Sequence, residues 1–317
     1  MLKDTSNFVK EYDFDHLRDR LYIHWDLLSV CNFKCSYCYA RRDYLPFNQW
    51  NKLLDYDKIL RIIEIISLSK LPVFLGLLGG EPTLHPRLKE IVSLIKKKIL
   101  DKHDKSRLYI TSNLSKNIFS NLEFNKKIFV LGSCHVSEKE KYGENFKNFF
   151  NSVETILDKG FKLKINIPLN SEKKFWGDTH YILEKLRNYN VNIHPHFLYS
   201  DGIDVLENYN EEFYNEFKEC LDSERNFVFE TKDNVYHFND YEIFKNDICH
   251  FKGWRCYQNN YEISWDGIVR NLCKDEECNL FSNPLFFRNL KVKPIICKKE
   301  NCLCDGLLKT YKEKISG

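Results

Sequence analysis

The chain has 317 residues, of which 43% are hydrophobic and 29% charged, enough for one large domain, or one large and one small. Its 48 basic and 45 acidic residues leave a formal charge of +3, which is too small to indicate nucleic acid as a partner. The first twenty residues are charged throughout, unlike a signal peptide, and no apolar run reaches the roughly 18 residues of a membrane helix. We therefore expect a soluble, cytoplasmic protein that has no membrane partner.

From Leu21 to about Tyr199, short apolar runs typical of strands alternate with amphipathic runs of helical period. The expected strands are Leu21–Leu28, Val73–Leu78, Arg107–Thr111, Ile128–Val136, Lys162–Leu169 and Val191–Leu198. Between them, Tyr56–Ser69 and Phe146–Lys159 each place apolar residues on one face, as amphipathic helices do. Repeated strand–helix units predict a parallel sheet, either an open one or a barrel.

The pattern changes after Asp201. A helix is expected around Glu211–Leu221, followed by two hairpins: Phe227–Thr231 with Val235–Phe238, and Tyr261–Trp265 with Ile268–Asn271, the second turning at Asp266-Gly267. The remaining segment to Cys304 has little periodicity and would need metal to hold it together. The expected organisation is an extension at 1–20, a first domain at 21–205 and a small Cys-rich domain at 206–317.

Twelve cysteines in a reducing compartment indicate metal or redox chemistry rather than disulfides. Cys31, Cys35 and Cys38 directly follow the first strand, at the end of the sheet where α/β folds build their sites. Three thiolates suit three irons of a cubane cluster and leave the fourth iron open for another ligand. The alternative is a structural zinc site, which prefers paired C-x2-C units and four ligands.

A second motif, Gly79-Gly80-Glu81-Pro82, stands at the end of the second strand. Paired glycines let a backbone approach a ligand closely and leave its amide and carbonyl groups free. C-x3-C-x2-C with Tyr37 before its last cysteine, followed by Gly-Gly-Glu-Pro, resembles the radical S-adenosylmethionine (radical SAM) superfamily over about Leu21–Tyr199. The resemblance implies an α/β fold, a partial (β/α)6 TIM-like barrel, followed here by a small Cys-rich α+β domain.

The resemblance also implies a 4Fe–4S cluster on Cys31, Cys35 and Cys38, with SAM chelating the open iron. Thr111-Ser112-Asn113 resembles the Thr-Asn-Gly segment near SAM, with Asn113 where glycine is usual. The implied cofactor-binding residues are Tyr37, Gly79, Gly80, Glu81, Ser112, Asn113 and Ser133. An electron from a reductant such as flavodoxin or ferredoxin would cleave SAM to a 5′-deoxyadenosyl radical, which takes a hydrogen atom from the substrate.

Strand alternation puts Ser133 and His135 on one face of the fourth strand and Cys134 on the other. The family usually carries Ser-x-Asp or Ser-x-His there, so Ser133 and His135 are expected to face the lumen, with His135 as a catalytic candidate. The expected polar residues of the lumen are His24, Asp26, His135, Lys164, Asn166, His194 and His196. Such a lumen suits a hydroxyl-rich or charged substrate better than a hydrocarbon.

Cys256-x10-Gly267-x5-Cys273 resembles the opening of the SPASM and twitch domains, which hold one or two auxiliary 4Fe–4S clusters. The ligands expected here are Cys256, Cys273, Cys297, Cys302 and Cys304, with Cys278 as an alternative ligand. No complete second quartet with a motif-like spacing exists, so one auxiliary cluster is favoured over two, with zinc as the alternative. Cys249 is a second catalytic candidate, because epimerases of similar layout return a hydrogen atom from a free cysteine.

Three functions follow. The leading one is an enzyme acting on a carbohydrate or nucleotide-sugar, as an epimerase or as a dehydrogenase with the auxiliary cluster as electron acceptor. The second is a maturase or epimerase that modifies ribosomal peptides, although only about twenty residues precede the first strand. The third is a zinc-binding protein without catalysis.

Overall fold

A curved, mostly parallel sheet forms the centre of the protein. The computed structural model describes residues 20–38, 56–198, 209–223, 227–230, 235–239, 242, 245–246, 250–256, 259–271, 273, 277–290, 294–298, 300, 302 and 312–313. The six parallel strands are β1 (Leu21–Leu28), β2 (Val73–Gly79), β3 (Arg107–Ser112), β4 (Ile128–Ser133), β5 (Lys162–Leu169) and β6 (Asn192–Phe197). The helices between them are α2 (Tyr56–Ser67), α3 (Leu88–Ile95), α4 (Lys147–Asp158) and α5 (Trp176–Leu186). Each strand lies beside the next one along the chain, as expected for repeated strand–helix units.

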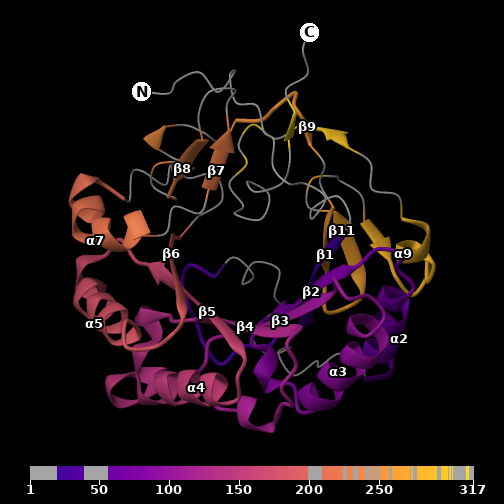
Figure 1. The fold of residues 1–317 in the computed structure, drawn as a ribbon, viewed down its shortest axis with the longest axis horizontal. Helices are drawn as coiled ribbons and strands as arrows, with labels where there is room; N and C mark the ends of the chain where they lie inside the picture. Colours follow the sequence, from indigo (N-terminus) through magenta and orange to yellow (C-terminus); the bar gives the residue numbers. More distant parts are fainter. Residues whose placement is uncertain are drawn as a thin grey trace.

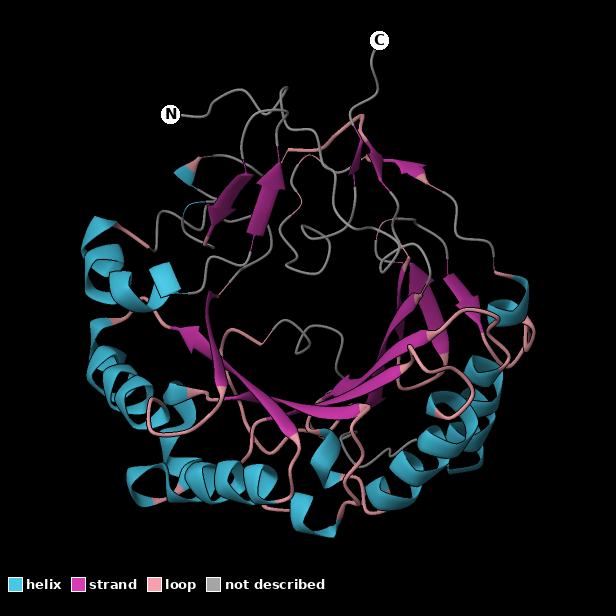
Figure 2. Cartoon of the chain, viewed as in Figure 1, coloured by secondary structure: helices cyan, strands magenta, loops and turns pink. Residues whose placement is uncertain are grey.

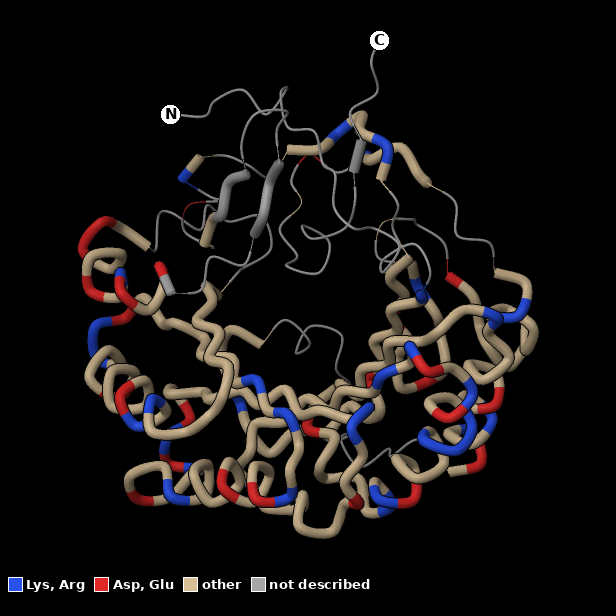
Figure 3. The backbone as a smooth tube through the Cα atoms, viewed as in Figure 1, with Lys and Arg blue, Asp and Glu red and all other residues tan. Residues whose placement is uncertain are grey.

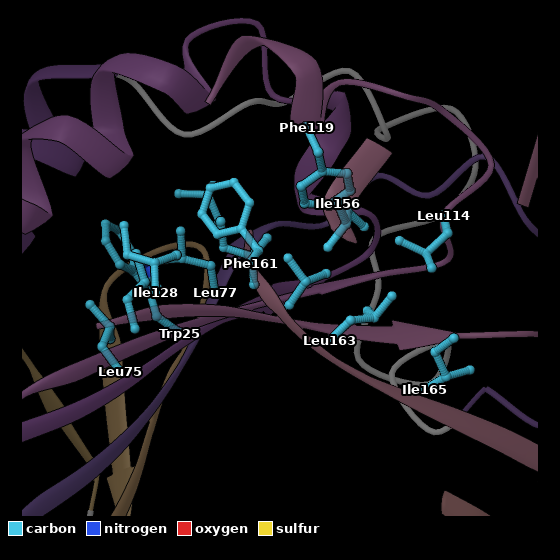
Figure 4. Close-up of a cluster of buried hydrophobic side chains, with 14 of the residues drawn as sticks. Trp25, Leu75, Leu77, Leu114, Phe119, Ile128, Ile156, Phe161, Leu163 and Ile165 are labelled. Atoms are coloured by element: carbon cyan, nitrogen blue, oxygen red, sulfur yellow. The ribbon is translucent and has the colours of Figure 1, made fainter. Parts of the chain in front are cut away.

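The two faces of the sheet differ as the sequence alternation predicts. In β1, Leu21, Ile23 and Trp25 are fully buried, whereas the residues between them are partly exposed. Figure 4 shows the apolar set, with Trp25, Leu75 and Leu163 of the sheet gathered with residues of the surrounding helices. Burial of each such side chain contributes about 1.5–3 kcal/mol, so this layer is the main source of the fold's stability.

The helices cover one face of the sheet and leave the other concave. Figures 1 and 2 show α2, α3, α4 and α5 along the outside of the arc formed by β1 to β6. Residues of both charge signs are spread over this outer helical layer in Figure 3, as expected where an amphipathic helix turns its polar face to solvent. The fold is therefore the expected α/β partial barrel, with the polar strand positions on its inner, concave face.

The second predicted hairpin joins this same sheet. It consists of β10 (Asn260–Ile263) and β11 (Ile268–Asn271), and Gly267 takes the positive φ of +84° at its turn. β10 pairs in parallel with β1, and β12 (Glu277–Asn279) extends the sheet beyond β11. The strand order of the nine-stranded sheet is β12-β11-β10-β1-β2-β3-β4-β5-β6. A segment assigned from sequence to the second domain thus continues the sheet of the first.

The described elements that follow β6 and lie outside this sheet complete the fold. They are α7 (Glu211–Ser223), β7 (Phe227–Glu230) paired with β8 (Val235–Phe238), α9 (Phe286–Asn289), and a small sheet of β9 (Arg255–Cys256), β13 (Ile295–Ile296) and β14 (Lys312–Glu313). Among the described helices, none combines the length and apolar character needed to cross a membrane.

The element bounds agree with the predicted ones within two residues, with one informative exception. β4 ends at Ser133 instead of Val136, because the chain turns at His135 into the 3₁₀ segment η7 (Val136–Tyr142). Cys134 is fully buried, as predicted, while Ser133 and His135 remain partly exposed. His135 therefore lies just beyond the strand, where its side chain meets the cysteine loop.

Candidate functional site

The cysteine loop directly follows β1. A turn closes its second half, where the amide of Cys38 donates to the carbonyl of Cys35 over 3.2 Å, and the amide of Phe33 donates to Cys31 Sγ over 3.4 Å. Desolvation raises the pKa of both Cys31 and Cys35 to about 12, with the like charges of neighbouring thiols adding to the shift. Without metal, these thiols therefore stay protonated at neutral pH. Binding to metal cations would ionise them.

These three thiols fit an iron–sulfur cluster by their number and type. Among the described residues, no three His, Cys, Asp or Glu side chains are gathered around a point where one metal ion would sit. A four-iron cluster is larger than a single ion, so its thiolates stand farther apart than zinc ligands do. Three cysteine thiolates are the donor set for a cubane with one open iron.

The Gly-Gly motif holds the cysteine loop against the end of β2. The amide of Gly80 donates to Leu28 O over 2.8 Å, and the amide of Glu81 donates to Val30 O over 2.7 Å. A Cβ atom on Gly80 would lie 2.0 Å from Val30 O, and Gly79 adopts a φ of +107°. The sequence prediction left both amides free for a ligand. The structure instead uses them to fix the loop, and this contact explains why glycine is required.

The carboxylate of Glu81 joins the ends of β2 and β3. It is 1% exposed; its Oε2 accepts from the amide of Asn113 over 2.7 Å, and its Oε1 accepts from Thr83 Oγ1 over 2.5 Å. Burial raises the pKa of Glu81, and hydrogen bonds from Asn113, Thr83 and Ser112 oppose that rise. Glu81 and Ser112 were both predicted to bind cofactor, and in the structure their side chains are hydrogen-bonded to each other.

Asn113 extends this network into the cysteine loop. Its Nδ2 donates to Asn32 Oδ1 over 2.9 Å, and its Oδ1 accepts from both the amide and the hydroxyl of Ser115. Asn32 Nδ2 completes the ring of contacts by donating to Ser115 Oγ over 2.8 Å. The sequence analysis did not identify Asn32 as a site residue. The one signal that could have indicated it was its position inside the cysteine loop.

Tyr37 of the cysteine loop contacts the end of β4. Its hydroxyl lies 2.9 Å from His135 Nδ1 and accepts from Ser137 Oγ over 3.3 Å, and the two rings stack with centroids 5.9 Å apart. Burial lowers the pKa of His135 to about 4. The structure therefore brings together Tyr37 and His135, which the sequence placed in the same site, and adds Ser137, which it had not.

Tyr142 stabilises the backbone around His135. Its hydroxyl accepts from the amide of His135 over 3.1 Å and donates to the carbonyl of Ser133 over 3.2 Å. Its ring packs edge-to-face on Phe33 with centroids 5.1 Å apart. The turn after β4 is thus fixed relative to the first half of the cysteine loop.

The polar residues predicted for the lumen share the concave face. In register, His24 lies beside Glu262, Asn166 lies beside both Ser133 and His194, and the rings of His194 and His196 stack with centroids 5.8 Å apart. Glu262 was not foreseen, because the parallel pairing of β10 with β1 joins segments far apart in sequence. The polar residues of this face include His24, Asp26, Thr111, Ser133, Lys164, Asn166, His194, His196 and Glu262.

Two groups on this face have unmet hydrogen-bonding capacity. The side-chain oxygens Thr111 Oγ1 and Asn166 Oδ1 are buried and have no hydrogen-bond partner among the described residues. Buried polar atoms are nearly always paired in native proteins. A polar ligand on the concave face would supply the missing partners.

Of the C-terminal cysteines, Cys256 and Cys297 come from adjoining strands. Cys256 lies in β9, Cys297 directly follows β13, and its amide donates to Trp254 O over 2.8 Å. Both are buried, as is Cys302, whereas Cys273 is half-buried after β11. Cys304 and the catalytic candidate Cys249 lie outside the described residues. The auxiliary cluster remains a prediction.

Comparisons with known proteins match parts of the chain. A GTP 3′,8-cyclase of Cyanothece sp. is 28% identical over 101 residues, 31% of each chain, and one of Mannheimia succiniciproducens is 36% identical over 78 residues, 25% of this chain and 23% of that one. This chain thus spans less than a third of the length of these relatives. A solved structure described as "Native anSMEcpe with bound AdoMet" shares the fold, with a TM-score of 0.54 and 13% identity over 86% of this chain and 79% of that one.

The family comparison covers the barrel itself. A model described as "Radical SAM superfamily" matches residues 27–212, more than half of the chain. The matched region contains the cysteine loop, the Gly-Gly motif and all strands from β2 to β6. The chain belongs to the radical SAM superfamily.

Proposed function

We propose that this protein abstracts a hydrogen atom from a carbohydrate or nucleotide-sugar bound on the concave face, acting as an epimerase or a dehydrogenase. Membership of the superfamily implies a 4Fe–4S cluster and SAM as cofactors, and argues against the alternative of a zinc protein without catalysis. When bound, these cofactors supply a reactive 5′-deoxyadenosyl radical. The chain itself must hold them, orient the substrate and exclude side reactions.

The distribution of charge on the concave face carries the proposal. Lys164, His194 and His196 lie on β5 and β6, while Asp26 and Glu262 lie on β1 and β10 at the other side of the arc. A basic side suits the phosphates of a nucleotide, because cationic side chains bind phosphate oxygens by charge-assisted hydrogen bonds. An acidic side suits sugar hydroxyls, since carboxylates accept hydrogen bonds from them.

The relatives give limited support. The names of the matched proteins specify a nucleotide substrate, GTP, and a cyclase reaction, which is neither an epimerase nor a dehydrogenase reaction. A nucleotide substrate is compatible with the basic side of the concave face. The reaction type remains part of the proposal.

The cofactors are proposed to lie where the loops after the strands meet. Cys31, Cys35 and Cys38 would hold the catalytic cluster, with SAM beside Gly79–Glu81, Tyr37, Asn113 and Ser133. Cys256 and Cys273, with Cys297, Cys302 and Cys304, would hold the auxiliary cluster, and a flavodoxin or ferredoxin would deliver the electron.

The test is substrate-dependent formation of 5′-deoxyadenosine by anaerobically reconstituted full-length protein. Panels of nucleotide-sugars, free sugars, nucleoside triphosphates and short peptides would be compared at equal concentration. We expect nucleotide-sugars to raise the rate above the background of SAM cleavage. Stimulation by peptides alone would favour the maturase function instead, and absence of any iron–sulfur chromophore would contradict both.

Heavy water separates the two reaction types. An epimerase that returns a hydrogen atom from an exchangeable thiol such as Cys249 incorporates deuterium into its product, and Cys249→Ala should abolish product while 5′-deoxyadenosine still forms. A dehydrogenase gives an oxidised product without that deuterium. Unchanged product formation by the Cys249 variant would exclude the thiol as the hydrogen donor.

A further inference from the structure

Four aromatic rings meet on the concave face of the sheet, each near the start of its strand. They belong to Tyr22 of β1, Phe74 of β2, Tyr109 of β3 and Phe129 of β4, and together we call them the aromatic layer. The ring centroids are 5.3 Å apart for Tyr22 and Phe74, 5.4 Å for Phe74 and Tyr109, and 5.6 Å for Tyr109 and Phe129. These are the distances of packed aromatic pairs, so the layer is continuous from β1 to β4.

Gly76 provides the space in which the ring of Tyr109 lies. A Cβ atom on Gly76 would lie 2.2 Å from Tyr109 Cζ and 2.3 Å from Tyr109 Oη, much closer than two such atoms can approach. Gly76 lies beside Tyr109 on one side and beside His24 on the other, and the ring of His24 meets that of Tyr109 edge-to-face, with centroids 6.2 Å apart. The ring of Tyr109 therefore extends from β3 across β2 toward β1.

The polar residues of the concave face lie farther along the same strands. Thr111 follows Tyr109 on β3, and Ser133 follows Phe129 on β4. Inward side chains of parallel barrels form such successive layers. Phe129 and Ser133 are four positions apart, about 13 Å at the rise of a strand. The lumen thus has a polar part beside the cysteine loop and an aromatic layer at its opposite end.

The side of the concave face proposed for the sugar adjoins this layer. Glu262 lies beside His24 in register, and Asp26 follows His24 on the same face of β1. His24 in turn contacts Tyr109 through its ring. A sugar whose hydroxyls donate to the acidic side chains would consequently lie next to the ring of Tyr109.

We infer that Tyr109 is a specificity-determining residue, whose ring over Gly76 closes the lower end of the lumen and limits how far a substrate extends away from the cysteine loop. The inference rests on the proposed function, because it concerns the room available to the sugar. Tyr109 is 7% exposed, and a packed interior resists the insertion of further groups. The lumen then admits a sugar with small substituents and excludes bulky groups that point toward the aromatic layer.

The first experiment tests the position of the ring by a double-mutant cycle in thermal unfolding of the full-length protein. Gly76→Ala should lower the melting temperature by several degrees, because the three atoms nearest to the new Cβ all belong to Tyr109. In a Tyr109→Ala background, the same substitution should cause no loss, since those atoms are absent. An equal loss in both backgrounds would show that the ring does not lie over Gly76, and would overturn the inference.

The second experiment measures selection by size. The probes are UDP-glucose, GDP-mannose and TDP-glucose, each with and without one benzoyl ester on a sugar hydroxyl, a group close in size to the phenol of Tyr109. Calorimetric binding to the anaerobically reconstituted protein with SAM should be about tenfold weaker for an ester than for its parent, as expected when a packed site is overfilled. In Tyr109→Ala, this ratio should fall to about threefold or less for at least one ester position. Tyr109→Phe retains the ring and should keep the wild-type ratio.

Tyr189→Ala is the matched control. It removes the same side chain from the outer layer, where the ring of Tyr189 stacks on Phe150 of α4, and it should also keep the wild-type ratio. Should Tyr109→Ala fail to fold, Tyr109→Leu fills part of the aromatic layer and still leaves the space over Gly76 open, so the same fall in the ratio is expected.

The outcomes are separable from those of the proposed function. Parent nucleotide-sugars that bind, with the same ratio for every ester in wild type and in the Tyr109 variants, contradict this inference alone. If no nucleotide-sugar binds to the wild-type protein, the proposed function fails, and the inference that rests on it fails as well.

Discussion

Asn113 stands where the family usually has glycine, and its side chain makes contacts that glycine cannot make. The resembling segments carry glycine at this position, whereas here the side chain joins the end of β3 to the cysteine loop through Asn32 and Ser115. Its backbone amide also donates to Glu81. The Asn113 side chain therefore connects the loop after β3 with the cysteine loop.

Replacement of Asn113 by glycine should weaken the protein even though it restores the usual family residue. The change leaves the polar groups of Asn32 and Ser115 with fewer partners, at a cost of about 1–3 kcal/mol. Thermal unfolding should show a melting temperature several degrees lower. Asn117→Gly, at an exposed position, is the control; equal effects of the two substitutions would contradict the role assigned to Asn113.

His135 should make stability depend on pH in acid. Desolvation lowers its pKa from 6.5 to about 4 in the folded state, so between these values the unfolded chain binds a proton that the folded one does not. Stability must then fall as pH decreases from about 6.5 to about 4, by on the order of 2 kcal/mol. Urea unfolding of His135→Asn should show a shallower slope over this range and a constant difference from wild type between pH 7 and 8. Parallel curves throughout would contradict the prediction.

At the scale of elements, the ends of β1 and β2 meet through glycine. Gly80→Ala would place Cβ 2.0 Å from Val30 O, so the cysteine loop must move away from β2. We expect a loss of about 2–3 kcal/mol in unfolding free energy and less iron bound per chain. Gly177→Ala, where a Cβ in α5 meets nothing within 4 Å, should be neutral or slightly stabilising. Full iron content in Gly80→Ala would show that the loop tolerates the displacement.

The elements themselves could be predicted because their signals are local. The alternation along β1 and the helical period of α2 can each be recognised within a short run of consecutive residues, and the structure confirms both. The cysteine loop and the Gly-Gly motif were recognisable by the spacing of their residues. The contact between them was not, because it forms only when β1 and β2 lie side by side in the sheet. The bond between Tyr37 and His135 joins residues 98 positions apart, and no local pattern predicts it. The position of β10 next to β1 could not be predicted for the same reason, since the two strands are far apart in the sequence.

At the scale of the whole molecule, the nine-stranded sheet crosses the predicted domain boundary. Tyr261 of β10 lies opposite Ile23 of β1, is 4% exposed, and packs edge-to-face on Phe286 and Phe287. Its backbone and ring therefore connect the Cys-rich C-terminal part to the first strand of the barrel. Loss of this ring should destabilise both parts together.

Tyr261→Ala should thus lower one common unfolding transition. Removing a buried aromatic ring costs about 3–5 kcal/mol, through lost burial and the cavity that remains. In urea, tryptophan fluorescence and far-UV circular dichroism should give coincident midpoints in wild type, and both should shift by the same amount in the variant. Leu285→Ala, at a side chain 42% exposed in the same C-terminal part, should shift neither. Two separate transitions, with the substitution moving one of them alone, would instead mean that the parts fold independently and that β10 docks on β1 as a finished unit.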